Sequence, residues 1–290
     1  MLKKYKAVFF DWDGTAVMSR KAPVEEAVKA MAPLLDEGVK LAIISGTTIE
    51  NIAGGEIVKY FTEKQLANLY LGLGRGAYNY MFQEGKPCCF QNMIPEERIL
   101  LNIHRICFDI HMELKERFGF DTDIVFSRPN YCKIDLMVNN ERGDNLFLQE
   151  SELDILKKVM AEHGMEGGIK QLMDLADEIG KKYQVTVVPT CDAKYLEVGI
   201  SSKSDNVNAI FGRIQEETDI KPEECAYWGD EYVGIEEGIF GSDSFMYTPV
   251  TASGDFFDVS DINSKNRPDW VRIIGGGVDS FLKFLCGQII

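Results

Sequence analysis

The chain has 290 residues, of which 45% are hydrophobic and 27% are charged, the balance of an ordinary soluble globular protein. This length is enough for a complete hydrophobic core and for two domains. The formal net charge is −15, with 46 acidic residues against 31 basic ones. Because nucleic acids and anionic membrane surfaces both require basic patches, we expect neither as a partner, and a phosphate site must be a locally positive spot.

The cysteines and the N-terminal residues indicate a cytoplasmic protein. The seven cysteines include no Cys-x-x-Cys pair and show no metal-ligand spacing with the three histidines, so we expect reduced thiols and no structural zinc site. The basic residues at the N-terminus run into a short apolar strand and not into a signal-peptide core. No segment approaches the roughly 20 apolar residues that span a bilayer.

The first part of the chain alternates buried strands with a helix. Residues 7–10 form a short apolar run that predicts a strand buried on both faces of a parallel sheet. A helix is expected after Pro23, with apolar residues at helical spacing up to Gly38, and further strands are expected at 39–44 and 69–73. This pattern predicts an α/β fold with a doubly wound, mostly parallel, Rossmann-like sheet, whose ligands bind at the carboxyl ends of the strands.

The pattern changes after Ala77 to a mixture of a hairpin, strands and longer helices, which predicts an inserted α+β unit. The elements expected in this unit are a hairpin at 78–92, a helix at 95–118, strands at 123–127 and 131–138, a turn at 139–143, helices at 151–163 and 168–183, and strands at 185–188 and 195–198. We therefore expect a core domain of residues 1–77 and 199–290 and a cap domain of residues 78–198.

The alternating pattern resumes after the inserted unit. The elements expected there are a helix from about Ser204, a strand at 226–228, short strands at 244–248 and 270–274, and a final helix after Gly277. Residues 250–268 show no regular pattern, and we expect a loop.

The strongest motif is Asp11-Trp12-Asp13-Gly14-Thr15, which follows the first strand. Two carboxylates two residues apart at the end of a buried strand can face one pocket. Asp11 is then a candidate nucleophile and metal ligand, and Asp13 is a candidate general acid and base. Gly14 permits a tight turn whose backbone N–H groups point at an anion. The alternative is a capped turn, in which Asp and Gly are common for local reasons.

Three weaker motifs lie in equivalent places. Ser45-Gly46-Thr47 follows the second strand and offers a hydroxyl and N–H groups at an expected helix N-terminus, which can hold phosphate. Lys203 lies at a helix start, where its charge can neutralise a phosphoryl group. Gly229-Asp230-Glu231 ends another strand with carboxylates that suit Mg²⁺. Taken alone, Ser45-Gly46-Thr47 is better explained as a helix cap and Lys203 as a surface lysine, and Gly229-Asp230-Glu231 could also be a helix cap.

In order and placement, these four motifs resemble those of the haloacid dehalogenase superfamily of aspartate-based phosphatases. The matching residues are Asp11-x-Asp13-Gly14-Thr15, Ser45, Lys203 and Gly229-Asp230. The resemblance covers essentially the whole chain and is better in the core than in the cap. The cap lies between the second and third motifs, as in the C2 class, and residues 195–198 before Lys203 look like the sugar-phosphate phosphatase branch of that class.

The resemblance implies a Mg²⁺-dependent phosphatase that hydrolyses small phosphate monoesters, with sugar phosphates as the expected substrates, through an aspartyl-phosphate. It makes Asp11 the nucleophile and Asp13 the general acid and base. The implied phosphate-binding residues are Gly14, Ser45, Gly46 and Lys203. The implied metal ligands are Asp11, Asp13 through its carbonyl oxygen, and Asp230. An acid at position 13 also indicates phosphoryl transfer rather than carbon–halogen chemistry.

The last motif departs from the family pattern. The family often continues to an Asn-Asp pair, which would fall at Val233 and Gly234, and neither of these residues can supply a carboxylate. Glu231 is the first alternative for the second acid and for a further metal ligand, and Glu236 is the second. The sequence leaves this choice open.

Substrate recognition is expected in the cap. Arg128 and Lys133 lie on or beside expected strands and are candidates for contact with a phosphate or with sugar hydroxyls, although a plain surface position is the simpler explanation for each. Arg75 lies in a glycine-rich run near the expected junction of core and cap, where the glycines form a hinge or a turn. The three histidines fall on expected helices outside the motifs.

Two other functions remain open from the sequence. A sugar phosphomutase of this fold would need a second phosphate site with clustered arginines, and the cap shows no such cluster. A catalytically silent binding or regulatory protein is supported only by the missing acid at Gly234. The expected partner is a small phosphorylated metabolite, and the oligomeric state is left open.

Overall fold

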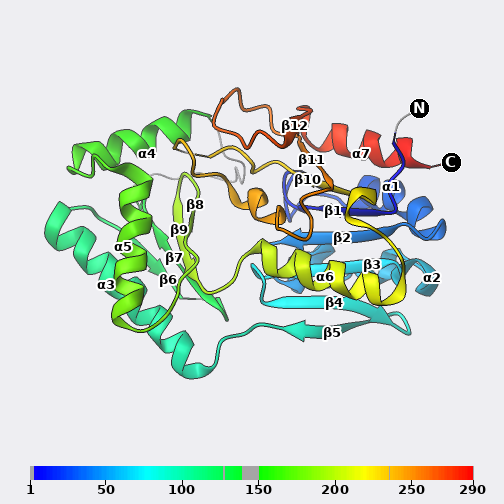
Figure 1. Cartoon of the computed structure of the whole chain (residues 1–290), viewed down its shortest axis with the longest axis horizontal. Coiled ribbons are helices and arrows are strands. Elements are labelled where there is room, and N and C mark those ends of the chain that lie inside the picture. The colour runs from blue at the N-terminus through cyan, green and yellow to red at the C-terminus, as the bar shows by residue number, and fades with distance from the viewer. Residues whose placement is uncertain (1–2, 127, 139–149, 235, 290) are drawn as a thin grey trace.

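The computed structural model describes residues 3–126, 128–138, 150–234 and 236–289. Strands within these residues form an eight-stranded sheet in the order β12-β11-β10-β1-β2-β3-β4-β5 and a separate four-stranded sheet in the order β6-β7-β9-β8. The two sheets lie at opposite ends of an elongated molecule (Figure 1). The predicted turn at 139–143 lies outside the described residues.

The larger sheet has a parallel centre, as the sequence predicted. Its parallel strands are β1 (Ala7–Phe10), β2 (Lys40–Ser45), β3 (Leu69–Leu73), β10 (Cys225–Gly229), β11 (Asp255–Asp258) and β12 (Val271–Ile273). Strands β1, β3 and β10 are buried along their whole length, as is usual for parallel strands covered on both faces. The predicted α/β fold with a mostly parallel sheet is confirmed.

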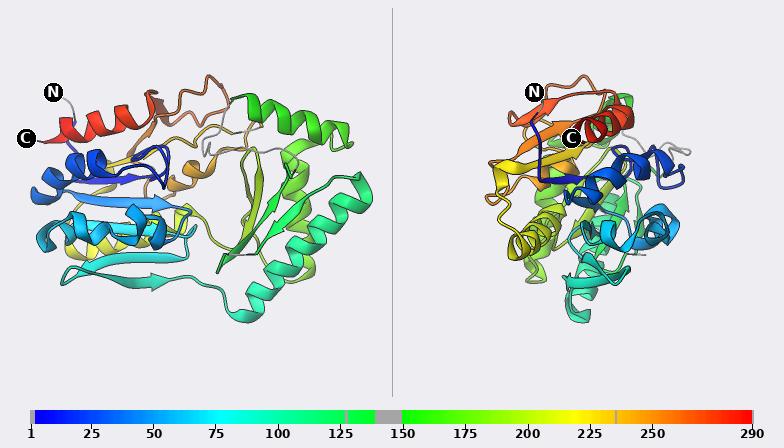
Figure 2. Two further views of the ribbon diagram at one scale, coloured as in Figure 1. Left: turned by 180° about the vertical axis from the view of Figure 1, so that it is seen from behind. Right: turned by 90° about the vertical axis from the view of Figure 1, so that its right-hand side faces the viewer.

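Helices cover both faces of the larger sheet (Figure 2). On one face, α1 (Glu25–Asp36) packs against α7 (Gly277–Gln288), and Phe281 of α7 contributes to the same hydrophobic core as Phe10 of β1. On the other face lies α6 (Lys203–Glu217), whose apolar side chains join a second core. This arrangement leaves the carboxyl ends of the parallel strands facing the smaller sheet.

The hairpin of β4 (Tyr78–Gln83) and β5 (Lys86–Asn92) lies where the sequence predicted a hairpin. Its turn residues Glu84 and Gly85 have positive φ values of 49° and 70°, as a tight hairpin turn requires. The hairpin was expected in the inserted unit, but β4 pairs antiparallel with β3, so both strands extend the larger sheet. A domain boundary at residue 77 would therefore cut through this sheet.

The inserted unit has a hydrophobic core of its own. Its elements are α3 (Glu97–Phe118), β6 (Asp123–Val125), β7 (Tyr131–Asp135), α4 (Glu150–Glu162), α5 (Gly168–Lys182), β8 (Thr190–Cys191) and β9 (Tyr195–Gly199). Its sheet is antiparallel throughout its described pairings. The predicted helical spacing in α3 is confirmed, because Ile103, Ile106, Ile110 and Leu114 are all buried in this core.

The strand predicted at 185–188 is wrong. Val188 N–H donates to Gly199 O at 2.7 Å, whereas Val185 N–H turns back to Gly180 O at 3.0 Å. Pro189 has no N–H to continue a ladder, so the regular strand β8 begins only at Thr190. The segment is thus bonded to its neighbours without forming a strand.

Two further predictions fail near the C-terminal part of the larger sheet. Residues 244–248 were expected as a strand, but Ser242–Met246 form a 3₁₀ helix. Residues 250–268 were expected as a loop, but they contain β11, which pairs with β10 and β12. Asp at both ends of β11 lowers its local strand propensity, and pairing with strands distant in sequence outweighs that preference.

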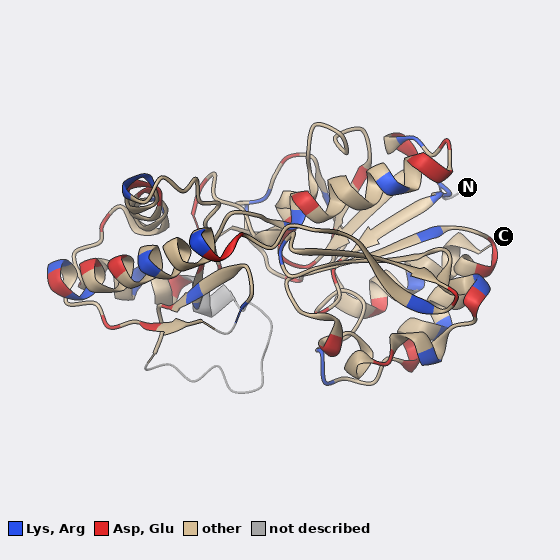
Figure 3. Cartoon of the chain, turned by 90° about the horizontal axis from the view of Figure 1, so that it is seen from below, with Lys and Arg blue, Asp and Glu red and all other residues tan. Residues whose placement is uncertain are grey.

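Charged residues are distributed over both ends of the molecule. Figure 3 shows Lys and Arg interspersed with Asp and Glu along the helices of the larger sheet and of the inserted unit. No helix among the described residues combines the length and the apolar character that crossing a membrane demands.

Candidate active site

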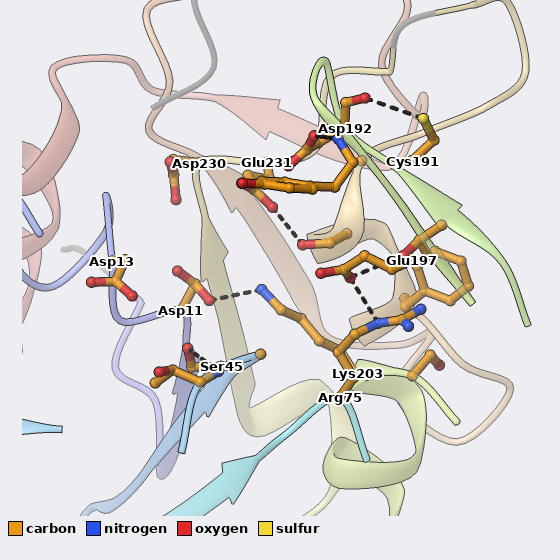
Figure 4. A pocket seen from close by; sticks show the side chains of 18 of the residues that line it. Asp11, Asp13, Ser45, Arg75, Cys191, Asp192, Glu197, Lys203, Asp230 and Glu231 are labelled. Atoms are coloured by element: carbon orange, nitrogen blue, oxygen red, sulfur yellow. Dashed lines mark hydrogen bonds and ion pairs between the residues drawn. The ribbon is translucent and has the colours of Figure 1, made fainter. Parts of the chain in front are cut away.

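The residues singled out in the sequence motifs gather in one pocket, between the carboxyl end of the larger sheet and the smaller sheet (Figure 4). On the side of the larger sheet, the predicted residues that line it are Asp11, Asp13, Ser45, Gly46, Lys203, Asp230 and Glu231. Lys133 lines it from the inserted unit, whereas Arg128 is not among its lining residues. The motifs therefore meet because β10, β1 and β2 are adjacent parallel strands that end at one edge.

Lys203 is the central cation of the pocket. Its Nζ donates to Asp11 Oδ1 at 2.7 Å and to Asp243 Oδ1 at 2.7 Å. Lys203 is the first residue of α6, and Ser202 with Asp205 forms a capping box that fixes this helix start. Only 5% of Lys203 is exposed, so its charge acts on the pocket with little screening by solvent.

The acidic side chains around Lys203 outnumber it. Burial raises the pKa of Asp11 well above its ordinary value; Lys203 opposes this effect, and Asp243 and Glu231 add to it. Burial also opposes the charge of Lys203, but Asp11 and Asp243 outweigh burial and raise the pKa of the ammonium group. Lys203 is therefore held in the charged form among carboxylates that together exceed its charge.

Asp230 lies directly beside the turn that follows Asp11. Thr15 Oγ1 donates to Asp230 Oδ1 at 3.0 Å. Gly14 has φ +92°, and a Cβ at this position would lie 2.2 Å from Asp230 Oδ2. Burial and the charge of Asp11 raise the pKa of Asp230 well above its ordinary value. Glycine is thus required at position 14 both for its backbone conformation and for the close approach of Asp230.

Asp13 lines the pocket and forms an ion pair with Arg20. Arg20 Nη2 lies 3.3 Å from Asp13 Oδ2, and Asp13 Oδ1 is buried with no hydrogen-bond partner among the described residues. Burial raises the pKa of Asp13, and Arg20 and Lys203 oppose the increase. A carboxyl group with a raised pKa and one unpartnered oxygen can hold a proton and transfer it.

The segment after β2 differs from its prediction. Ser45 Oγ accepts a hydrogen bond from Thr47 N–H at 3.3 Å, and Thr47 Oγ1 is buried without a partner among the described residues. An α-helix N-terminus was expected here, but the segment that follows contains only short 3₁₀ turns, of which the first is Ile49–Asn51. The donors available to an anion are therefore the loop hydroxyls and N–H groups and not a helix dipole.

The pocket has carboxylates suited to a cation, but it does not have a full set of side-chain ligands for one. Within the described part of the chain, no group of three His, Cys, Asp or Glu side chains is arranged to hold a metal ion. Asp11 is nevertheless a buried carboxylate and Asp230 a half-buried one, and the charge of Asp11 raises the pKa of Asp230. Mg²⁺ is usually bound by one or two carboxylates, with other oxygens and water completing its shell. The buried surplus of negative charge is what such a cation would neutralise.

Another buried acid, Asp243, lies beside Lys203 and was not singled out in the sequence. Asp243 is fully buried; its Oδ1 accepts from Lys203 and its Oδ2 accepts from Glu231 N–H at 2.8 Å. Glu231 lines the pocket and accepts from Ser242 Oγ at 2.6 Å. Glu236 lies elsewhere, accepting from the N–H groups of Ile169 and Lys170 at the start of α5. Asp243 directly precedes the strand predicted at 244–248 and belongs to none of the four sequence motifs.

The inserted unit contributes a second group of charges to the pocket. Glu197 on β9 lies 2.6 Å from Lys133 Nζ and 3.0 Å from Arg75 Nε. Figure 4 shows Arg75 extending toward Glu197 and Lys203 extending toward Asp11. Arg75 was predicted near the junction of core and cap, whereas Glu197 was not singled out because one acid on a predicted strand carries no motif. Arg128, by contrast, is not brought into this pocket.

No protein-family model and no curated protein sequence matches this chain. Solved structures match it in fold. Plasmodium falciparum IMP-nucleotidase gives a TM-score of 0.57 at 12% identity, over 99% of this chain and 62% of that one. An IMP-bound mutant of the same enzyme gives 0.59 at 12% identity, over 98% and 66%. A protein from Eubacterium rectale gives 0.54 at 12% identity, over 98% of both chains.

These matches concern the fold, since their sequence identity is low. This chain also spans only 62% of the length of the Plasmodium falciparum enzyme. The common architecture is a mostly parallel α/β sheet with an inserted smaller unit, and the pocket lies between the two. The chain therefore shares its overall fold with these proteins.

Proposed function

We propose that this protein hydrolyses phosphate monoesters through an aspartyl-phosphate formed on Asp11. The observation that carries the proposal is the placement of Asp11 at the carboxyl end of β1, buried and 2.7 Å from Lys203. A carboxylate oxygen in this position is a nucleophile next to a buried positive charge that can attract a phosphoryl group. Asp13 and Asp230 lie beside it in the same pocket.

In the first step, an Asp11 carboxylate oxygen attacks phosphorus, and the bond from phosphorus to the ester oxygen breaks. Asp13 donates its proton to the departing oxygen, a role that its raised pKa supports. Lys203 contacts the phosphoryl oxygens as charge moves onto them. The hydroxyl of Ser45 and the N–H group of Gly46 provide further donors. The Gly14 N–H, which the sequence analysis also named, donates to Val17 O at 2.7 Å instead.

In the second step, Asp13, now ionised, accepts a proton from water as the water oxygen attacks phosphorus. The bond between phosphorus and Asp11 breaks, which releases inorganic phosphate and restores both carboxyl groups. Thr47 Oγ1, buried and unpartnered, is a further donor for a phosphoryl oxygen. Asp243 acts through Lys203, whose ammonium group it holds in position.

We infer that Mg²⁺ is the cofactor. Its ligands would be Asp11, the carbonyl oxygen of Asp13, and Asp230, with Glu231 as a further candidate. A bound divalent cation would reduce the repulsion between the Asp11 carboxylate and the incoming phosphate dianion. The raised pKa values of Asp11 and Asp230 support this inference, because both reflect buried negative charge that lacks a sufficient counter-charge.

The leading substrate class is sugar phosphates, with the inserted unit acting as a cap of the C2 class that contacts the leaving group. Lys133 lines the pocket from this unit and supports the proposal. Nucleoside monophosphates are a second candidate, favoured by the fold match to an IMP-bound nucleotidase. The two candidates place different demands on the cap, since a nucleobase is planar and a sugar presents hydroxyls in several directions.

The test is release of inorganic phosphate from a panel of sugar, polyol and nucleoside phosphates, with and without Mg²⁺. We expect wild-type protein to turn over at least one ester only with Mg²⁺. Asp11→Asn should abolish turnover because an amide is neither an effective nucleophile nor an anionic metal ligand. Asp36→Asn, at the end of α1 and remote from the pocket, is the matched control and should retain activity.

Absence of phosphate release from every ester would contradict the proposal. A phosphomutase would then be tested by isomerisation of sugar phosphates with a bisphosphate activator. A silent binding protein would bind a phosphate ester without turnover, which calorimetry measures directly. Activity retained in folded Asp11→Asn would exclude the aspartyl-phosphate route while leaving phosphatase activity in place.

A further inference from the structure

Arg75 is a buried arginine held in an unusual backbone conformation at the border between the larger sheet and the inserted unit. It has φ +54°, between Gly74 at +65° and Gly76 at +94°. Ser201 Oγ donates to Arg75 O at 2.7 Å, and Gly76 N–H donates to Asn206 Oδ1 at 2.6 Å. A non-glycine residue persists in the left-handed region only where its surroundings determine it, and such strain is common at ligand sites.

The guanidinium group of Arg75 is only partly satisfied. Its Nε lies 3.0 Å from Glu197 Oε2, its Nη2 donates to Val188 O at 3.3 Å, and its Cζ lies 5.0 Å from the ring centroid of Tyr131. Its Nη1 is buried and has no hydrogen-bond partner among the described residues. The residue is 4% exposed and lines the pocket. A buried N–H without an acceptor is unfavourable, and an acceptor on a bound ligand would remove that cost.

Glu197 fixes the direction of Arg75. One of its oxygens binds Lys133 and the other lies near Arg75 and 3.3 Å from Thr190 Oγ1. Burial disfavours its charge, but Lys133 and Arg75 outweigh burial and lower the pKa of Glu197 to about 2. Both carboxylate oxygens are therefore engaged by protein groups, whereas Nη1 of Arg75 remains a donor without an acceptor among the described residues.

The charges in this part of the pocket balance. Arg75 and Lys133 are cationic, while Glu197 and Asp192 are anionic, and all four line the pocket. A second phosphate would require a surplus of positive charge. Neutral oxygen atoms, such as sugar or polyol hydroxyls, require only donors. The part of the pocket around Arg75 and Glu197 is therefore suited to an uncharged leaving group that is rich in oxygen atoms.

We propose that Arg75 contacts the substrate directly, donating from Nη1 to a hydroxyl oxygen of a neutral, polyhydroxylated leaving group, and that Glu197 is the residue that positions it. This proposal rests on the proposed phosphatase function. It adds a specificity-determining residue from the larger sheet to a pocket wall otherwise formed by the inserted unit. It also predicts that the substrate is a hydroxylated monophosphate and not a bisphosphate.

The experiment compares Arg75→Lys with wild type on two esters, the most active hexose or polyol phosphate and phenyl phosphate, whose leaving group has no hydroxyl. We expect the KM for the hydroxylated ester to rise about 10- to 100-fold with kcat changed by less than about 3-fold, since a contact present in both the bound and the transition state affects binding. The kcat/KM for phenyl phosphate should change by less than about 3-fold. Arg272→Lys, an arginine that pairs with Asp255 and is 65% exposed, is the matched control.

If Arg75→Lys lowered kcat/KM equally for both esters, its role would be structural and the proposal would be overturned. If kcat/KM fell for neither ester, direct contact with substrate would be excluded. Should Arg75→Lys fail to fold, wild type alone decides the matter with deoxy analogues of the hydroxylated ester. At least one deoxygenation should lower kcat/KM about 10-fold, and a series without any loss overturns the proposal. Failure of the phosphatase function is distinct, because wild type would then release phosphate from neither ester.

Discussion

Two buried groups of charged side chains face the same pocket, and their charges are balanced differently. The acidic cluster belongs to the larger sheet and its connections and consists of Lys203 with Asp11, Asp230, Glu231 and Asp243. The paired cluster spans the two units and consists of Glu197 with Arg75 and Lys133. Lys203 alone opposes four acids in the first, whereas one acid lies between two cations in the second.

Burial acts in the same direction on the acids of both clusters, yet their pKa values move in opposite directions. The pKa values of Asp11 and Asp230 rise, and that of Glu197 falls to about 2. The difference comes from the neighbouring charges and not from depth. An acid with insufficient counter-charge is suited to bind a cation or to react, while a fully paired acid is suited to orient its partners.

The largest effect should come from Lys203→Met, which removes the cation of the acidic cluster while keeping an apolar stem. We expect kcat for phosphate release to fall by about 10²- to 10³-fold, the usual loss when a charged group facing the reacting centre is removed. Steady-state kinetics of phosphate release measure this effect. Lys283→Met, on an exposed part of α7, should leave kcat unchanged. Full activity of Lys203→Met would contradict the conclusion that the acidic cluster, and not the paired cluster, carries the reaction.

A smaller loss is expected from Asp243→Asn. The amide keeps the size of the side chain but holds the Lys203 ammonium group less firmly than the carboxylate does, so kcat should fall by about 10- to 100-fold. The KM should change little, because Asp243 acts through Lys203 and not on substrate. Asp269→Asn replaces an exposed aspartate and serves as the control. A rise in KM at constant kcat would argue for direct contact between Asp243 and substrate.

Gly14→Ala tests how closely Asp230 must approach the first motif. Gly14 and Gly38 both have positive φ, +92° and +87°, but only at Gly14 would a Cβ meet a neighbour, since nothing lies within 4 Å of the Gly38 position. Both alanine variants should lose about 1 kcal/mol in free energy of unfolding through the backbone alone. Gly14→Ala should also displace Asp230 and lower kcat about 10-fold. Equal kinetics in the two variants would show that the position of Asp230 is not critical.

The smallest effect on turnover and the clearest effect of pH should come from Glu197→Gln. The pKa of Glu197 is lowered from 4.5 to about 2 in the folded protein, so its ionised form stabilises the fold above pH 4.5 and this contribution is lost as pH falls toward 2. Near pH 7, the free energy of unfolding of Glu197→Gln should be lower than that of wild type by on the order of 2 kcal/mol.

Urea denaturation at several pH values measures this difference. The difference in free energy of unfolding between wild type and Glu197→Gln should decrease steadily below pH 4.5, where Glu197 of the unfolded chain becomes protonated. Glu178→Gln, on an exposed position of α5, should show no such dependence. A gap that stays constant with pH would mean that Glu197 contributes through packing and not through its charge.

Much of the fold was predictable because its signals are local. The apolar runs of β1 and β3 and the helical spacing of α3 arise from neighbouring residues, and the structure has these elements where they were expected. Two of the predictions that failed concern partners far apart in sequence. β11 is a strand because β10 and β12 flank it, and β4 joins the larger sheet because β3 presents a free edge.

The residues of the candidate site likewise fall into those with a local sequence signal and those without one. Asp11, Asp13, Lys203 and Asp230 were identifiable because each belongs to a short motif at the end of a strand or the start of a helix. Asp243 was missed because nothing around it in the sequence marks it as a partner of Lys203. It lies 40 residues from Lys203 along the chain and 2.7 Å away in space.

The sequence by itself determined the alternation of strands and helices, the insertion of a second unit, and the four motifs that resemble those of aspartate-based phosphatases. Local periodicity and short-range chemistry are sufficient for each of these. Only the tertiary structure decided which charges are paired. The Arg75–Glu197 pair, for example, joins the larger sheet to the inserted unit at 3.0 Å. Pairing depends on which strands become neighbours, and that is determined by the packing of the whole chain and not by any segment of it.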